Sequence, residues 1–424
     1  TLSFAITRNS LMSEICYPSN QTLMRVDQAL AQILSQVKPL ETLEHIPIDQ
    51  ASGRILAETV YAPAAIPAHA VAAMDGYGLA SQSIQEQAFS CHQVGISWAG
   101  NPFAGIVKPG ECVRIFTGAV VPEGVDSVVA QEQVSAEGET IYFPEQTANY
   151  RNIRAAGSDV PAGQVLLENG TLLSPVALGL LASAGISQVN VIRRLKIGFF
   201  SSGDELNTLG SDLTIGQIYD SNRYQLSALL QNPLYQLFDL GILADDPLLL
   251  EQTLNHAAPE LDVLISTGGA SVGDADFIQQ CLQKCGEVDL WKIAIKPGKP
   301  LAFGRIGECL FFGLPGNPVA VWVSFEKFVR PALIKRAGGP LRLNMRISAR
   351  CLSALRKRPG REEYQRGILQ QTPNGEFTVT PVSGQDSHQL SSATQANCFI
   401  VLSHDCTGIA AGENVVVEPL QLTI

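Results

Sequence analysis

The chain has 424 residues, of which 46% are hydrophobic and 16% are charged, and its formal net charge at pH 7 is −11. This composition is typical of a well-packed folded protein and excludes an intrinsically disordered one. The length exceeds what one core usually organises, so we expect about two to four domains. The acidic balance argues against non-specific nucleic-acid binding, which needs a basic surface.

The nine cysteines include no Cys-x-x-Cys pair and are scattered along the chain, often beside apolar residues. This favours reduced, mostly buried thiols over a disulfide framework. No apolar stretch approaches the length of a transmembrane helix, and residues 1–20 lack the apolar centre of a signal peptide. We therefore expect a cytoplasmic protein with no membrane span.

The N-terminal part of the chain predicts one helix and then β structure. Residues 1–21 resemble a loosely ordered leader. Apolar residues recur at helical spacing over residues 26–37, and Lys38-Pro39 ends the pattern. From Tyr77 to about Asn149, short β-favouring runs alternate with Gly, Pro and Asn, which indicates an inserted all-β module.

The remaining sequence predicts a helix, an α/β region and a β-rich tail. Ser174 and Pro175 suit the cap and first turn of a helix that ends before Gly185. After Pro340, apolar and polar residues alternate between turn signals. The predicted fold is thus multidomain, α/β and β, with these parts: an elongated, discontinuous N-terminal domain (22–65 and 150–194), a β-rich inserted domain (66–149), a central doubly wound α/β domain (195–338) and a small C-terminal β-barrel (339–424).

Short polar segments follow three apolar runs of the α/β region, at residues 195–200, 262–265 and 310–312. Such runs are typical of buried parallel strands. The loops that leave the carboxyl ends of parallel strands share one edge of the sheet, where ligands bind. We therefore expect the three loops to meet and to bind a phosphorylated ligand, with a metal ion.

The first two loops carry groups suited to phosphate and Mg²⁺. The first contains Ser202, Gly203 and Glu205, but alone it is more typical of a helix cap with an acidic first turn. The second continues through Gly268, Gly269 and Ser271 into an acidic segment that includes Asp276. It lacks the Gly-Lys-Ser/Thr of a Walker loop. Its acids either complement a helix dipole or bind Mg²⁺ with substrate oxygens.

Two further segments are stiffened by proline. Residues 292–300 hold three lysines, among them Lys292 and Lys296. In an acidic chain we interpret this cluster as an anion clamp, the alternative being a solvated charged turn. Residues 313–318 combine two glycines, an asparagine and the prolines Pro315 and Pro318, which predicts a rigid loop that fixes backbone dipoles at the sheet edge.

Together these segments resemble the molybdopterin molybdenumtransferases, which include bacterial MoeA proteins and the E-domain of gephyrin. The resemblance runs in order over residues 23–424 and is carried by the following segments: Ala73-Met-Asp-Gly-Tyr77, Arg114-Ile-Phe-Thr-Gly-Ala119, Asn152-Ile-Arg154 with Gly157-Ser-Asp159, Ser202-Gly-Asp-Glu-Leu206, Gly216-Gln-Ile-Tyr-Asp-Ser-Asn222, the 268–276 loop, and residues 292–300 and 314–318.

The resemblance implies an enzyme that takes adenylylated molybdopterin and molybdate, with Mg²⁺, and releases AMP and molybdenum cofactor. It implies an elongated homodimer whose site lies between the α/β domain of one subunit and domains of the partner. Further partners would be the molybdopterin adenylyltransferase and molybdoenzyme chaperones. No nucleic-acid or membrane partner is expected.

The resemblance also assigns roles to individual positions. Thr117, Asp159, Glu205, Asp245 and Asp276 match catalytic positions, and Glu205 and Asp276 are the expected metal ligands. Lys292, Lys296, Pro315 and Pro318 match the substrate-binding lysines and the proline loop, to which Ser202, Gly203, Gly268, Gly269 and Ser271 add phosphate contacts. Arg366 and Ser387 match positions that hold molybdate, since a guanidinium and a hydroxyl suit an oxyanion.

One segment departs from the family pattern. The family has Phe-Asp-Asn-Ser before Ala-Met-Asp-Gly-Tyr, whereas this chain has His69-Ala-Val-Ala72, so Ala70 replaces an Asp important for activity. The departure leaves a second hypothesis open, a catalytically weakened paralogue that binds the pterin nucleotide as a binding or scaffold protein. A general nucleotide hydrolase is a third hypothesis, but it gives no reason for the inserted and C-terminal β domains.

Overall fold

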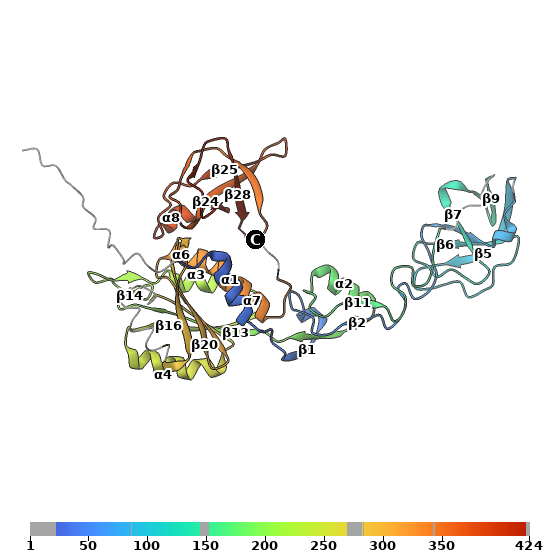
Figure 1. Cartoon of the computed structure of the whole chain (residues 1–424). Helices are drawn as coiled ribbons and strands as arrows, with labels where there is room; N and C mark the ends of the chain where they lie inside the picture. Colours follow the sequence, from blue (N-terminus) through green and yellow to red (C-terminus); the bar gives the residue numbers. More distant parts are fainter. Residues whose placement is uncertain are drawn as a thin grey trace, which may run out of the picture.

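The structure is a computed structural model of the chain, and it describes residues 23–85, 87–144, 152–268, 282, 284–341 and 344–420. The described part is elongated, with a β-rich lobe at one end and an α/β domain and a barrel at the other (Figure 1). None of the helices in these ranges is long and apolar enough to cross a membrane.

Small antiparallel pairs connect the two ends. Strand β1 (Leu43–Pro47) pairs with β12 (Gln188–Ile192), β2 (Val60–Tyr61) with β11 (Val165–Leu167), and β3 (Val71–Ala72) with β10 (Ile153–Arg154). Helix α2 (Pro175–Ser183) is capped as predicted, because Ser174 Oγ accepts a hydrogen bond from the amide of Ala177 at 3.2 Å. Gly185 follows the helix at a φ of 76°. A short 3₁₀ turn, η1 (Ile48–Gln50), follows β1.

The β-rich lobe is one six-stranded sheet in the order β7-β4-β6-β5-β9-β8. Its strands are β4 (Gly76–Leu79), β5 (Phe89–Ser97), β6 (Glu111–Ile115), β7 (Ser127–Ala130), β8 (Ser135–Glu137) and β9 (Thr140–Phe143), with the turns η2 (Ser81–Ser83) and η3 (Gln131–Gln133). The all-β structure expected after Tyr77 is therefore present.

The α/β domain contains a six-stranded sheet in the order β16-β13-β17-β21-β20-β18. Strands β13 (Leu195–Ser202), β16 (Tyr235–Leu243), β17 (Val263–Thr267) and β21 (Cys309–Leu314) are parallel. Strands β20 (Pro300–Ile306) and β18 (Glu287–Lys292) continue the sheet antiparallel to their neighbours. The small pair β14 (Leu206–Asn207) and β15 (Ile218–Tyr219) lies beside it.

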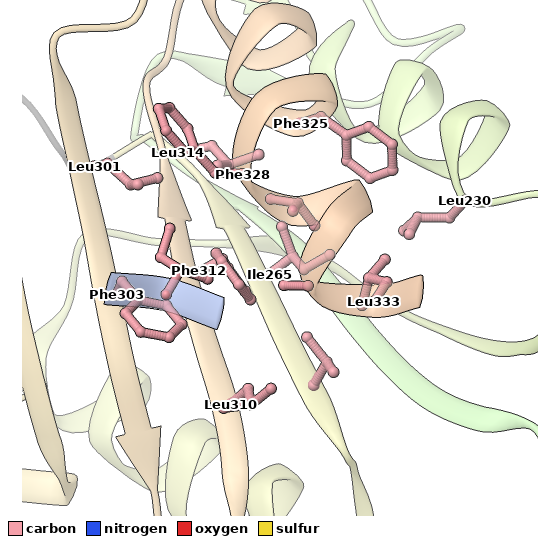
Figure 2. Packing of buried hydrophobic residues seen from close by; sticks show 14 of the residues in the cluster. Leu230, Ile265, Leu301, Phe303, Leu310, Phe312, Leu314, Phe325, Phe328 and Leu333 are labelled. Carbon is pink, nitrogen blue, oxygen red and sulfur yellow. The ribbon is translucent and has the colours of Figure 1, made fainter. Parts of the chain in front are cut away.

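Helices cover both faces of this sheet, as the doubly wound fold predicts. One face packs against α3 (Asn222–Leu229), α6 (Pro318–Ser324), the π-helical turn η6 (Phe325–Val329) and α7 (Arg330–Arg336). The other packs against α4 (Pro247–Ala257), which is followed by η5 (Ala258–Glu260). Figure 2 shows Ile265 and Phe312 of the strands against Phe328 of the helical layer. Burial on both faces explains why these strands are apolar runs without alternation.

Helix α1 (Val26–Gln36) packs on the α/β domain, although the sequence grouped it with the N-terminal domain. Its Ile33 is fully buried in the same core as Leu333 of α7. Lys335 Nζ also donates to the carbonyl oxygen of Leu34 at 2.7 Å.

The C-terminal domain is a closed five-stranded barrel, in agreement with the prediction. Its strands are β22 (Ile347–Cys351), β24 (Glu362–Gln371), β25 (Phe377–Pro381), β26 (Cys398–Leu402) and β28 (Asn414–Pro419), and β24 pairs with both β25 and β26 to close it. Helix α8 (Leu390–Ala393) and the pair β23 (Leu355–Arg356) and β27 (Gly408–Ile409) complete the domain, and β19 (Ile295–Lys296) of the α/β domain pairs with β24.

Candidate active site

The carboxyl ends of the parallel strands lie in register at one edge of the sheet. Ser201 pairs with Thr267, and Thr267 with Leu314, so the segments after β13, β17 and β21 leave the sheet side by side. Ser202 pairs with Leu243 of β16, which brings the segment containing Asp245 to the same edge. The edge that the sequence predicted as a binding site therefore exists, and it is made by four strands.

Hydrogen bonds join the segment after β13 to the segment after β16. Ser202 Oγ donates a short hydrogen bond to Asp245 Oδ1. The backbone N–H of Asp245 donates to Asp204 Oδ1 at 3.1 Å. A Cβ atom at Gly203 would lie 2.6 Å from Glu205 Oε2, so the carboxylate of Glu205 lies against the backbone of its own loop. Three acidic residues thus gather at this edge.

Gly268 has a packing requirement that only glycine satisfies. Its φ is 86°, and a Cβ atom there would lie 2.1 Å from the carbonyl oxygen of Ser202. An added Cβ at Gly316 would lie 3.8 Å from Gly268 Cα. The second loop is therefore in close contact with both the first loop and the proline loop that contains Pro315.

Segment 216–222 carries part of the family resemblance, but its residues had no predicted role at the site. Asn222 Nδ2 donates to the carbonyl oxygen of Gly316 at 2.7 Å, which fixes the proline loop. Asn222 Oδ1 and Asp220 Oδ2 are buried without a hydrogen-bond partner. Asp220 is only 1% exposed and lies 3.7 Å from Arg223 Nε. Buried polar atoms without hydrogen-bond partners are uncommon, and an ordered water molecule, an ion or a ligand can complete their bonding.

The barrel approaches the same region from the side of Pro318. The backbone N–H of Val319 donates to the carbonyl oxygen of Ser387 at 3.1 Å. Arg366 is fully buried, and its Nη2 donates to the carbonyl oxygens of Gly384 and Asp386 at 2.6 and 3.3 Å. The two predicted molybdate residues are therefore close to each other and to the proline loop.

Arg366 retains unused donors. Its Nε and Nη1 atoms are buried and have no hydrogen-bond partner. Burial lowers the pKa of the guanidinium, and the charge of Asp386 offsets part of that effect. A buried guanidinium with two unpaired nitrogen atoms is suited to an oxyanion, which would supply both charge and acceptors.

The lysine segment has a contact that the sequence did not reveal. Lys296 Nζ donates to Glu363 Oε1 at 3.1 Å, and the side chain of Glu363 is buried. A Cβ atom at Gly298 would lie 2.7 Å from Ser324 Oγ, so the segment lies against helix α6. The backbone of Lys292 accepts a hydrogen bond from the amide of Met24 at 3.0 Å. The ammonium of Lys296 is thus positioned by the barrel.

A second group of residues, which includes the predicted Thr117 and Asp159, lies on the β-rich lobe and on the segments that connect it to the rest of the chain. The backbone N–H and the hydroxyl of Thr117 donate to Asp75 Oδ1 at 2.8 and 2.7 Å. Both bonds lower the pKa of the Asp75 carboxyl, and the bond from the backbone N–H of Thr117 has the larger effect. Asp159 is exposed, and its amide donates to the carbonyl oxygen of Ile66 at 3.1 Å. Ala70 is half-buried, and its carbonyl oxygen accepts from the amide of Val121 at 2.9 Å.

Within one chain these two groups do not meet, because the β-rich lobe and the sheet edge of the α/β domain lie at opposite ends of the molecule (Figure 1). Gly269, Ser271 and Asp276 lie outside the described residues. Among the side chains that the structure describes, no group of three or more His, Cys, Asp or Glu residues is arranged to hold a metal ion. The carboxylates at the sheet edge nevertheless fit Mg²⁺, which commonly takes one or two carboxylates plus substrate oxygens.

The fold defines a multidomain protein built around a doubly wound α/β domain, with an inserted β domain and a barrel that reaches the strand-end edge of the α/β sheet. Three family models match it. They are the MoeA N-terminal region (domain I and II) over residues 24–185, the probable molybdopterin binding domain over 198–335, and the MoeA C-terminal region (domain IV) over 348–420.

Relatives match nearly the whole chain. The molybdopterin molybdenumtransferase of Haemophilus influenzae is 41% identical over 94% of this chain and 98% of its own length. The molybdopterin molybdenumtransferase of a Nostoc species is 35% identical over 88% of this chain and 87% of its own length. The crystal structure of the molybdopterin biosynthesis moeA protein from Pyrococcus horikoshii superimposes with a TM-score of 0.81 at 28% identity, covering 94% of this chain and 100% of that one. The chain belongs to the molybdopterin molybdenumtransferase family.

Proposed function

We propose that this chain is a transferase of molybdenum cofactor biosynthesis that inserts molybdate into adenylylated molybdopterin and releases AMP. The observation that carries the proposal is the convergence of the strand-end loops with the buried, partly unpaired guanidinium of Arg366. Relatives of 35–41% identity that share this architecture bear the name molybdopterin molybdenumtransferase, which supports the same assignment.

The strand-end loops would bind the phosphate groups of the substrate. Gly203 and Gly268 allow the two loops to pack tightly, because the carboxylate of Glu205 and the carbonyl oxygen of Ser202 lie where their Cβ atoms would be. Backbone N–H groups of these loops would donate to the phosphate oxygens. The unpaired Asn222 Oδ1 would accept a hydrogen bond from the substrate. Glu205 and Asp276 would hold Mg²⁺ together with substrate oxygens, and the bound ion would withdraw charge from the phosphoanhydride group. Asp245, oriented by Ser202, would accept a proton from the attacking water.

The molybdate subsite would be formed between the barrel and the proline loop. Nε and Nη1 of Arg366 would donate to the oxyanion, and the hydroxyl of Ser387 would add a hydrogen bond. Lys296 would supply a second positive charge, positioned by its ion pair with Glu363. Such fixed donors hold molybdate in one orientation toward the dithiolene sulfurs, which favours transfer by positioning.

The second residue group requires a second chain. Thr117 and Asp159 lie far from the sheet edge of their own chain, yet the family resemblance assigns them to the same reaction, and Asp75 is bonded to Thr117. A homodimer in which each β-rich lobe faces the partner's sheet edge would complete two equivalent sites. Gel filtration with light scattering would test the dimer, and a monomer that is fully active would refute it.

A reducing compartment fits the thiols of the chain. Among the described cysteines, Cys91, Cys112, Cys309, Cys351 and Cys398 are buried free thiols. We therefore place the reaction in the cytoplasm. The molybdopterin adenylyltransferase would supply the substrate there, and molybdoenzyme chaperones would accept the product.

AMP release from adenylylated molybdopterin tests the function directly. We expect release that requires both Mg²⁺ and molybdate. Calorimetry that detects tight substrate binding, with no turnover in the same preparation, would instead support the weakened paralogue suggested by Ala70. The relatives that match nearly the whole chain favour the enzyme.

A further inference from the structure

A second cavity lies between the α/β domain and the barrel, apart from the strand-end site. It has a volume of about 520 Å³, which is within the usual range of about 300–1,000 Å³ for small-molecule sites. Helix α3 and the segment from α6 to α7 form one wall, and α8 with the end of the barrel forms the other. None of the strand-end residues described above lines it.

The lining of this cavity is mixed, with seven apolar residues and six polar or charged ones, the latter including Gln231, Asn232 and Thr394. Leu229, Pro233 and Trp322 come from the α/β domain, while Leu390 and Leu420 come from the barrel. The indole of Trp322 packs against Phe399 with ring centroids 4.9 Å apart, so its position is fixed by the barrel core. An aromatic or aliphatic body of moderate size would bury its surface here without rearrangement of the walls.

The polar groups of the cavity point to an uncharged ligand. Glu326 and Arg330 are the only charged residues in the described lining, and they form a bidentate pair at 2.7 and 2.8 Å. Their charges offset each other, so the cavity has no unbalanced charge to attract an ion. Gln225 Oε1, by contrast, is buried and has no hydrogen-bond partner. It requires a donor, which a ligand hydroxyl or N–H group would provide.

We propose that this cavity is a binding site for a neutral amphipathic small molecule that has an aromatic body and one hydrogen-bond donor directed at Gln225. Because its two walls belong to different domains, the bound molecule would hold the barrel against the α/β domain. Helix α8 begins three residues after Ser387, so occupancy would also restrain the barrel segment that contacts Val319.

The test uses 4-phenylphenol as the probe and the anionic biphenyl-4-carboxylate as its matched comparison. Calorimetry with the full-length protein should detect binding of the phenol and at least tenfold weaker binding of the carboxylate. Gln225→Leu should weaken binding of the phenol roughly tenfold, because the donor loses its acceptor. The phenol should also raise the midpoint of thermal unfolding.

Two variants fill the cavity from opposite rims. Ala228→Trp on α3 and Thr394→Trp after α8 change exposed residues, so folding should survive in at least one of them. Each should abolish binding, whereas Ala31→Trp on the exposed side of α1 should not. The proposal would be overturned if millimolar 4-phenylphenol did not bind the wild type. It would also be overturned if both rim variants bound the phenol as tightly as the wild type does. The proposal would also be overturned if the rim variants changed their oligomeric state but still bound the phenol. The cavity would then be occupied by the surface of another protein chain.

Discussion

The carbonyl oxygen of Ser387 in the barrel accepts a hydrogen bond from the amide of Val319, directly after Pro318 of the α/β domain. This contact sets the position of the barrel relative to the proline loop. It also places Arg366, whose guanidinium is bonded to the carbonyl oxygen of Asp386, beside the sheet edge. The two domains thus contribute to one site within a single chain, and the molybdate subsite depends on their junction.

Arg366→Met should reduce molybdate-dependent AMP release roughly 10- to 150-fold, the effect of losing a hydrogen bond to a charged group. Stability should change little, because Met removes two buried nitrogen atoms that have no partner but also removes the bonds from Nη2 to the carbonyl oxygens of Gly384 and Asp386. Steady-state rates at varied molybdate, with thermal unfolding, separate the two effects. Arg350→Met, on an exposed barrel residue paired with Glu376, is the matched control. Equal rates in the two variants would exclude Arg366 from the subsite.

Asp245→Asn should lower the rate by roughly 10²- to 10⁴-fold, because the proposed proton acceptor is lost while the oxygen that accepts from Ser202 is kept. Asp246→Asn next to it is a close control. Asp246 caps helix α4 through bonds to the amides of Leu248 and Leu249, and Asn caps a helix about equally well. Rates at saturating substrate should distinguish the pair, and an unaffected Asp245→Asn enzyme would contradict the assigned role.

Gly268→Ala should destabilise the protein by more than Gly210→Ala. Both glycines have a φ of 86°, so both substitutions carry the same backbone strain, about 1–3 kcal/mol. Only Gly268 would in addition force a Cβ to 2.1 Å from the carbonyl oxygen of Ser202, since nothing lies within 4 Å of a Cβ at Gly210. Urea unfolding of the two variants measures the difference. Similar losses of stability in the two variants would show that the loops around Gly268 can move to accommodate a Cβ atom, so that the contact with Ser202 does not require glycine.

The sequence predicted the sheet edge well, because the apolar runs 195–200 and 310–312, which lie in strands β13 and β21, are specified locally by composition and flanking glycines. It gave no role to Asp220 and Asn222, whose importance depends on burial and on a contact with Gly316 that is distant in the chain. It also missed the pairing of Lys296 with Glu363, which forms only when the barrel closes on β19. Contacts between residues of different domains leave no pattern in the local sequence from which they could be predicted.

The carboxylate of Asp262 should make the free energy of unfolding decrease as the pH falls into the acid range. Burial raises the pKa of its carboxyl, but bonds from Arg193 at 2.6 and 2.8 Å and from the amide of Lys196 outweigh burial, so the pKa lies below its ordinary value. A lowered carboxyl pKa stabilises the folded state above the unfolded pKa of about 3.9. This stabilisation is lost as the pH falls through the folded value.

Asp262→Asn should therefore cost about 2 kcal/mol at neutral pH, because the half-buried Arg193 loses the charged acceptor of its two hydrogen bonds. The cost should shrink toward pH 3. Denaturant titrations between pH 3 and 7 measure this trend, and Glu308→Gln, at a side chain that is 99% exposed, controls for the change of charge. A cost independent of pH would mean that the effect of the substitution is steric rather than electrostatic.

Ala70→Asp should raise the rate of AMP release, because the substitution adds a carboxylate in the segment that bonds to Val121, four residues after Thr117. The position is half-buried, so the charge can stay hydrated and folding should be unaffected. His69→Asp places the same charge one residue earlier, at an exposed position, and should leave the rate unchanged. Single-turnover assays with equal protein concentrations compare the three forms. An unchanged rate in Ala70→Asp would mean that the residues already present beside Thr117, such as Asp75, are sufficient for the reaction.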